Sequence, residues 1–249
     1  MTDTLNVTHI DPVTGLTYRV RPGLAGQGKA PCLVLLHGVA SNEAGFIDLA
    51  RQVDPHITVV LARGPLVLSQ SQFAWFQVSF TANGPAINAG QAEQARTKLI
   101  DFLGQLRPLL GVDPARTFIA GFSQGGIMSA SVALTAPGKV AGFGILSGRI
   151  LPEVLPLVKD DPLLATLPAF VSHGLQDAVL GIHFAHQART VLAGLGVPVS
   201  YHEYEGGHSL NGAMAADFLQ WLSAQLDAPA RTPQLFPSTH FKKAHHANR

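Results

Sequence analysis

Short apolar runs alternate along this chain with longer segments in which apolar residues recur at helical spacing. The short runs predict strands at residues 16–21, 32–36, 58–62, 117–120, 142–146, 169–172 and 199–204. The periodic segments predict helices at residues 44–53, 86–110, 125–134, 183–195 and 212–226. This alternation predicts an α/β fold, with a mainly parallel, twisted sheet covered by helices on both faces. In such folds ligands bind beyond the carboxyl ends of the strands.

One strand-to-helix junction carries a pattern with chemical meaning. The run 117–120 leads into Gly121-Phe122-Ser123-Gln124-Gly125, which reads as the G-x-S-x-G nucleophile elbow. The small glycines permit a sharp turn that lifts Ser123 above the sheet, at the N-terminus of the next helix, where negative charge is stabilised. A pentapeptide this short also occurs by chance in ordinary glycine-rich turns. Ser123 is therefore a candidate nucleophile that needs a base.

An acid and a histidine follow in the order that such an elbow requires. Asp177 comes shortly after the apolar run 169–172 breaks at Gly174, and His208 follows two glycines after the run 199–204. Both positions lie on loops at strand ends, so they can meet Ser123 at one edge of the sheet. We predict a catalytic triad of Ser123, Asp177 and His208.

Acyl transfer also needs fixed donors for a tetrahedral oxyanion. The apolar run 32–36 ends in His37-Gly38-Val39, a loop of the type that supplies one backbone N–H, the other coming from the residue after the nucleophile. The predicted donors are therefore the backbone N–H groups of Val39 and Gln124. His37 is interpreted as an orienting, hydrogen-bonding residue rather than a proton carrier.

Aromatic residues and histidines elsewhere give weaker signals. Phe73, Trp75 and Phe76 either shape an apolar substrate pocket or serve only as packing residues. His183 and His186 have an H-x-x-H spacing, but no third ligand lies nearby in the sequence, so no metal site is predicted.

Composition narrows the remaining possibilities. Charged residues make up 13% of the 249 residues and apolar residues 47%, a balance typical of one compact enzyme domain. The net charge of +1 does not favour a nucleic-acid partner, and no apolar stretch reaches the length of about 18 residues that stable membrane insertion needs. The start of the chain shows no signal peptide, and the single cysteine, Cys32, excludes an intrachain disulfide. We expect a cytoplasmic protein.

The chain divides into a catalytic domain, residues 1–228, and a C-terminal tail, residues 229–249. The tail contains Pro229, Pro233 and Pro237 together with basic residues, and it has no acidic residue. This composition predicts an extended or disordered segment. The tail either has no function or packs on its own domain or on a neighbouring subunit, which would make a homodimer.

Taken together, these motifs resemble the phospholipase/carboxylesterase family of α/β-hydrolases, which includes acyl-protein thioesterases and small bacterial carboxylesterases. The resemblance rests on Leu36-His37-Gly38, Arg63-Gly64-Pro65, Ala74-Trp75-Phe76, Gly121 to Gly126, Leu146-Ser147-Gly148, His173-Gly174 with Asp177, and Gly207-His208. It implies the same triad, a fold without a large separate lid domain, and hydrolysis of carboxylic esters or thioesters with no metal and no organic cofactor. Ala40 and Ser41 depart from the glycine and aspartate that usually follow the first of these motifs.

We therefore expect a serine hydrolase that cleaves small-molecule carboxylic esters with small to medium acyl chains, through an acyl-enzyme. Two alternatives within the class are a lysophospholipase and an acyl-protein thioesterase. An alternative from another class is a hydrolase fold that serves as a binding module without turnover. The intact Ser123, Asp177 and His208 argue against the binding module.

Overall fold

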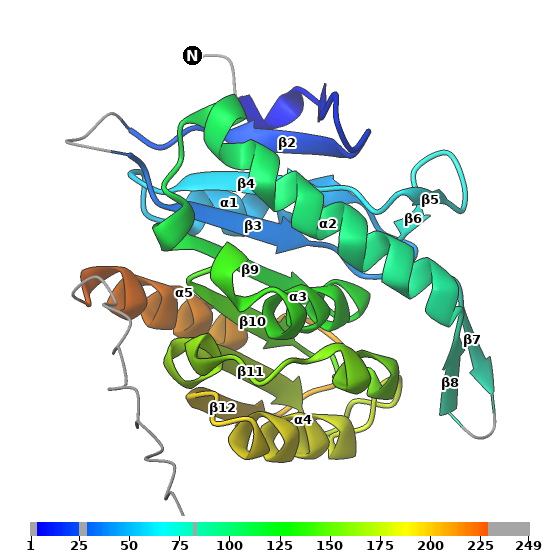
Figure 1. The fold of residues 1–249 in the computed structure, drawn as a ribbon. Helices are drawn as coiled ribbons and strands as arrows, with labels where there is room; N and C mark the ends of the chain where they lie inside the picture. The colour runs from blue at the N-terminus through cyan, green and yellow to red at the C-terminus, as the bar shows by residue number, and fades with distance from the viewer. Residues whose placement is uncertain (1–3, 25–28, 82–83, 229–249) are drawn as a thin grey trace, which may run out of the picture.

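An eight-stranded sheet forms the centre of the molecule (Figure 1). The structure is a computed structural model, and it describes residues 4–24, 29–81 and 84–228. Along the sheet the strands follow the order β1-β2-β4-β3-β9-β10-β11-β12. Their bounds are His9–Ile10 (β1), Thr17–Arg21 (β2), Thr58–Ala62 (β4), Cys32–Leu36 (β3), Thr117–Phe122 (β9), Gly142–Leu146 (β10), Ala169–Gly174 (β11) and Val199–Tyr204 (β12).

The sheet is parallel from β4 to β12, while β1 and β2 pair antiparallel at one edge. The register brings Leu36, the last residue of β3, opposite Gly121 of β9, and Leu146 of β10 opposite Phe122. The carboxyl ends of these strands therefore lie level with one another. The loops that follow them meet at one edge of the sheet, as expected for a parallel sheet.

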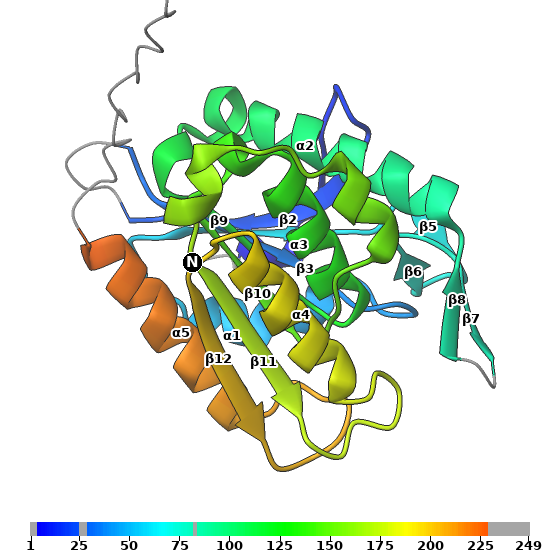
Figure 2. The same ribbon diagram turned by 60° about the horizontal axis from the view of Figure 1, so that its bottom comes forward.

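Helices cover both faces of the sheet and give it two cores. On one face lie α2 (Ala89–Leu110), α3 (Gln124–Thr135) and α4 (His183–Gly194), whose apolar side chains join one core cluster. On the other face α1 (Ile47–Gln52) and α5 (Gly212–Asp227) pack through Leu49, Phe218 and Trp221. Figure 2 shows α4 and α5 on opposite sides of β11 and β12. Because both faces are covered, β3, β4 and β10 are buried along their whole length.

Two small strand pairs and several 3₁₀ helices lie outside the central sheet. The two-residue strands β5 (Leu66–Val67) and β6 (Phe73–Ala74) form one antiparallel pair, and β7 (Val78–Thr81) with β8 (Gly84–Ile87) forms another that projects from the domain (Figure 1). Short 3₁₀ helices occur at Thr4–Asn6, Glu43–Phe46, Pro114–Arg116, Pro137–Lys139, Pro152–Leu157 and Pro162–Thr166.

The structure confirms the predicted α/β architecture and all seven predicted strands, but two of the five predicted helices begin later than expected. Where the first was predicted to start, residues 43–46 form a 3₁₀ helix, and α1 itself spans Ile47–Gln52. The helix predicted to begin at residue 86 begins at Ala89, because residues 84–87 pair with β7 instead. Asn88 caps the helix, since its side chain accepts a hydrogen bond from the N–H of Gln91. The sequence pair Asn83-Gly84 is a hairpin signal that the prediction overlooked. The predicted tail, residues 229–249, lies outside the described residues.

Candidate active site

Ser123 stands at a strained turn between β9 and α3. Its backbone has φ of +54° and ψ of −117°, in a region that side chains other than glycine rarely adopt. The two flanking glycines make the turn possible. A Cβ on Gly125 would lie 1.8 Å from the carbonyl oxygen of Leu36, and one on Gly121 would lie 2.4 Å from the backbone of Gly125. The Ser123 N–H donates to the carbonyl of Leu146 at 2.8 Å, which fixes the turn to β10.

The structure brings Ser123, His208 and Asp177 into one hydrogen-bonded relay. The Ser123 Oγ lies 2.8 Å from Nε2 of His208, and Nδ1 of the same ring lies 2.6 Å from Oδ2 of Asp177. With the proton on Nδ1, the ring donates to the carboxylate and accepts from the serine hydroxyl. This is the geometry in which an imidazole can take the proton of a serine that attacks a carbonyl.

The Asp177 carboxylate is held firmly below the surface. Its side chain is completely buried, whereas that of His208 is 16% exposed. The other carboxylate oxygen, Oδ1, accepts the backbone N–H groups of Val179 and Leu180 at 2.9 and 2.8 Å. Because every oxygen has a donor, the buried charge is balanced and the carboxylate can hold the histidine ring in one orientation.

A second histidine, His173, lies behind the acid, and the sequence analysis assigned it no role. It is the last residue but one of β11, four positions before Asp177, and is fully buried. Its Nε2 lies 2.6 Å from the carbonyl of Leu180 and 3.3 Å from Oδ2 of Asp177, while its Nδ1 has no hydrogen-bond partner among the described residues. Burial lowers the pKa of His173, so the ring is neutral and donates through Nε2. It supports the loop that carries Asp177.

Two backbone N–H groups beside Ser123 have no acceptor in the described part of the chain. They belong to Val39, after β3, and to Gln124, the first residue of α3. At a helix N-terminus the first N–H groups have no intrahelical acceptor and face outward. An oxyanion site requires N–H donors of this kind, which are not already bonded to another acceptor.

The Gln124 side chain serves a different purpose from its backbone. It is buried, its Oε1 accepts the N–H of Trp75 at 2.7 Å, and its Nε2 donates to the carbonyl of Phe76 at 2.7 Å. Both neighbours are 1% exposed. The amide therefore joins the segment after β6 to the start of α3.

His37 also has a purely structural set of partners. Its Nε2 accepts the N–H of Gly64 at 2.9 Å, so the proton sits on Nδ1 and is donated to the carbonyl of Gly38 at 2.7 Å. Burial lowers the pKa of His37, which keeps the ring neutral. The Trp75 indole N–H donates to the His37 carbonyl at 2.9 Å, completing the support of the loop that bears Val39.

Two cavities meet at Ser123. The larger, of about 350 Å³, is bordered by His208, Phe122, Phe46 and Leu210. The narrower encloses only about 20 Å³ and is otherwise open to solvent; its lining includes Gln124, Ile127, Phe76, Val78, Ile87 and Arg149. Val39, Ser123 and Val179 line both cavities.

Of the three aromatic residues expected near the substrate, only Phe76 lines either of these two cavities. Trp75 is buried beneath the loop at Gly38, and its indole N–H is already bonded to His37. Phe73 lies in β6, with the guanidinium of Arg63 over its ring at 4.5 Å. Phe73 and Trp75 therefore make packing contacts and do not line these two cavities, and their role toward a substrate stays a prediction.

The His183 and His186 pair does not gather metal ligands. His186 lies 2.8 Å from Glu203, and the ring of His183 packs against Phe184. Among the residues that the structure describes, no group of three or more histidine, cysteine, aspartate or glutamate side chains is placed to hold a metal ion.

Comparison with known proteins shows the family and the fold of the chain. The family model described as Phospholipase/Carboxylesterase matches residues 25–226. The acyl-protein thioesterase 1 of Yarrowia lipolytica is 25% identical over 213 residues, covering 78% of this chain and 91% of that protein. The acyl-protein thioesterase 1 of Eremothecium gossypii is 27% identical over 238 residues, covering 88% and 99%. The crystal structure of a carboxylesterase from Mesorhizobium loti superposes with a TM-score of 0.72 at 24% identity, covering 87% and 98%.

The fold is that of the α/β-hydrolases. Since the family model spans most of the sequence, the chain belongs to the phospholipase/carboxylesterase family, and it is a hydrolase of the esterase class that acts on small-molecule esters. Within the described ranges, none of the helices combines the length and the apolar character needed to cross a bilayer.

Proposed function

We propose that this protein hydrolyses carboxylic esters with small to medium acyl chains through an acyl-enzyme on Ser123, with His208 as the acid–base group and Asp177 as its partner. The observation that carries this proposal is the continuous relay of 2.8 and 2.6 Å from serine to histidine to aspartate. It ends at a serine that borders two cavities.

The reaction has two halves. The Ser123 Oγ attacks the ester carbonyl carbon while Nε2 of His208 takes the hydroxyl proton, and Asp177 stabilises the imidazolium that forms. The tetrahedral intermediate then expels the alcohol, which leaves with the proton from Nε2. Water attacks the acyl-enzyme, again giving its proton to Nε2, and the acid departs as Ser123 recovers its hydrogen.

The negative oxygen of each tetrahedral intermediate binds the backbone N–H groups of Val39 and Gln124. Removing one donor of this kind typically costs about 10²- to 10³-fold in kcat. The support for this assignment is that neither N–H has another acceptor among the described residues.

Labelling and turnover together test the proposal. A fluorophosphonate should label Ser123 in the wild type and not in Ser123→Ala, and p-nitrophenyl acetate turnover should fall by about 10⁴-fold or more in that variant. Correctly folded wild type that is neither labelled nor active would refute the proposal and favour a binding module.

A chain-length series decides between the activities within the class. The names of the fungal relatives make a thioesterase the second candidate. Rates on p-nitrophenyl esters of increasing acyl length, compared with a lysophospholipid and a palmitoylated peptide thioester, separate the three. We expect small to medium acyl chains to be preferred over long ones, since the larger of the two cavities at Ser123 measures only about 350 Å³.

The proposal includes a setting for the enzyme. A cytoplasmic location is supported by the single buried cysteine, whose pKa burial raises to about 12, so that this thiol is inert. The net charge of +1 supports action without nucleic acid. A homodimer is also part of the proposal, on the ground of the apolar Leu235, Phe236 and Phe241 in the sequence of residues 229–249. Light scattering of the full chain tests it.

A further inference from the structure

Arg149 places a cationic side chain at the narrower of the two cavities. It follows Ser147-Gly148 at the end of β10 and lines that cavity together with Ser123 and Gln124. The backbone of this loop adjoins the elbow itself, since a Cβ on Gly148 would lie 3.0 Å from the carbonyl oxygen of Ser123. The position next to Gly148 therefore belongs to the wall of the site.

The half-buried guanidinium of Arg149 is poorly satisfied by the protein. Its Nη2 donates to the carbonyl of Pro85 over a long 3.3 Å, and its centre lies 5.0 Å from the ring of Phe184. Its Nε is buried and has no hydrogen-bond partner among the described residues. Glu153 acts on it only at longer range, and burial lowers the pKa of the guanidinium in spite of that charge.

Other arginines with partly buried side chains are better satisfied. Arg19 and Arg63 both bond to the carboxylate of Glu43, and Arg21, whose Nε is also unpartnered, donates to four carbonyl oxygens. Arg149, by contrast, forms no ion pair with any described carboxylate. A partly desolvated cation with a free donor is costly unless a ligand supplies an anion.

The geometry of the reaction determines whether the alcohol or the acyl chain of an ester lies near Arg149. The departing oxygen must lie near Nε2 of His208 to receive its proton, so the alcohol occupies the larger cavity, which His208 borders. The carbonyl oxygen faces the N–H groups of Val39 and Gln124. The acyl chain is left with the solvent-open side of the site at the narrower cavity, which Arg149 lines and His208 does not.

We propose that Arg149 is a specificity-determining residue that binds a carboxylate carried by the acyl chain of the substrate. The preferred substrates are then half-esters of short dicarboxylic acids, whose methylene groups pack on Phe76, Val78 and Ile127 while the free carboxylate pairs with the guanidinium. This inference rests on the proposed function and adds to it the chemical class of the acyl group.

Two matched pairs of esters test the inference at neutral pH, with kcat/KM measured by pH-stat titration. Monoethyl glutarate and ethyl pentanoate are alike except for a carboxylate on the acyl chain. O-acetylglycolate and ethyl acetate carry the same difference on the alcohol. We expect the wild type to favour the anionic member of the first pair and not of the second.

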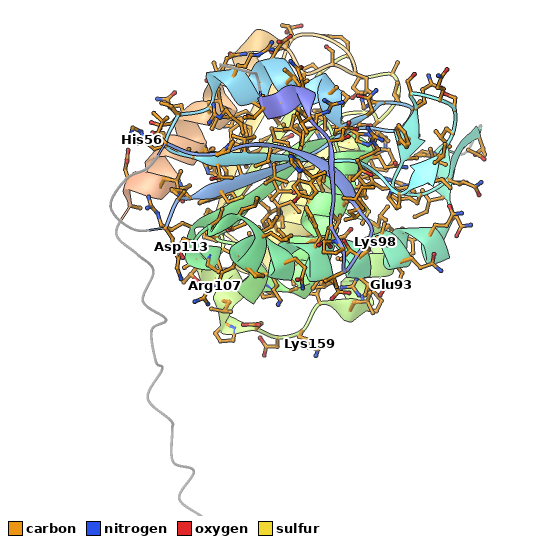
Figure 3. All side chains as sticks on the ribbon, turned by 90° about the horizontal axis from the view of Figure 1, so that it is seen from above. His56, Glu93, Lys98, Arg107, Asp113 and Lys159 are labelled. Atoms are coloured by element: carbon orange, nitrogen blue, oxygen red, sulfur yellow. The ribbon has the colours of Figure 1, made fainter. Side chains whose placement is uncertain are left out.

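Substitution of the arginine should remove that preference. Arg149→Met should lower kcat/KM for monoethyl glutarate by about 10- to 100-fold, the value of a charged hydrogen bond, and change that for ethyl pentanoate little. Arg149→Lys should keep part of the preference. The matched control is Arg107→Met, which removes the same charge from an exposed position in the last turn of α2. Glu93 marks the opposite end of that helix (Figure 3), and both rates should be unchanged in the control.

Three results would overturn the inference. They are an equal loss on both acyl-chain esters in Arg149→Met, a wild type that prefers ethyl pentanoate, and an anionic preference that appears on the alcohol side. The wild-type comparison needs no variant, so it decides the matter even if Arg149→Met fails to fold. Turnover of p-nitrophenyl acetate without an anionic preference refutes this inference alone. Absence of both labelling and turnover refutes the proposed function itself.

Discussion

The amide of Gln124 offers a sharp test of how the loop after β6 is held to the elbow. Gln124→Met keeps the length and the approximate volume of the side chain and leaves the backbone N–H of residue 124 in place. It removes two hydrogen bonds of 2.7 Å, one from the N–H of Trp75 and one to the carbonyl of Phe76. Both backbone groups are buried, and no other acceptor or donor for them lies among the described residues.

The magnitude follows from these two orphaned groups. Leaving a buried donor or acceptor unsatisfied costs about 1–3 kcal/mol. The variant should therefore lose about 2–6 kcal/mol of the free energy of unfolding, less if water reaches the site. Since a domain is typically stable by only about 5–15 kcal/mol, the loss should be plain in a urea titration followed by tryptophan fluorescence.

Gln91→Met is the matched control for this experiment. Gln91 makes the same kind of bond, from the N–H of Gln77 to its Oε1 at 2.8 Å, but in an exposed setting. Water replaces that bond when it is lost, so the cost should stay below about 1 kcal/mol. If the two variants unfolded at the same urea concentration, the idea that Gln124 fastens the loop would be refuted.

Three further predictions concern packing, charge and pH. Gly125→Ala should destabilise the protein by about 3 kcal/mol or more, because its Cβ would meet the carbonyl of Leu36, whereas Gly212→Ala, with open space around it, should not; thermal unfolding of both checks this. Glu43→Gln should lower the free energy of unfolding, measured in urea, by about 1–3 kcal/mol, since Arg19 and Arg63 lose a shared buried anion. Glu93→Gln, at a more exposed ion pair, should lower it by less than about 1 kcal/mol. Equal losses in the two variants would contradict an effect of burial. Burial lowers the pKa of His37 and of His173 in the folded state. Below about pH 6.5 the unfolded chain therefore binds more protons than the folded chain. The free energy of unfolding is greatest above that pH and decreases as the pH falls. The slope should be at most about 1.4 kcal/mol per pH unit for each histidine, and His173→Gln should reduce it in urea titrations at a series of pH values; an unchanged slope would rule out His173 as a source.

The strand pattern was predictable because strands of a parallel sheet that are buried on both faces have continuous apolar sequences. Residues 32–36 and 58–62 are such runs, and both are fully buried strands. The pairing of β7 with β8 was missed because the Asn83-Gly84 signal was overlooked and the residues of β8 were included in the helical pattern that follows them. The helix boundary at Asn88 was a local capping effect that a periodicity argument passes over.

The site was predictable as far as single loops follow single strands. The elbow, the acid and the histidine each carry a local sequence signal, and the structure places all three within hydrogen-bonding distance. The contributions of His173, Gln124 and Arg149 depend on contacts between distant segments. No spacing in the sequence shows that the Gln124 amide meets Trp75, or that Arg149 shares a cavity with Ser123.

Val179 lies where the two cavities adjoin, and this has a consequence for how the enzyme can be altered. Its backbone N–H holds Asp177, but its side chain is 42% exposed and only borders the space around Ser123. A change of side chain here keeps the backbone donor, so the shape of both cavities can be adjusted at one position while the hydrogen bond to Asp177 remains. For redesign by directed evolution, this residue is the natural first site to randomise.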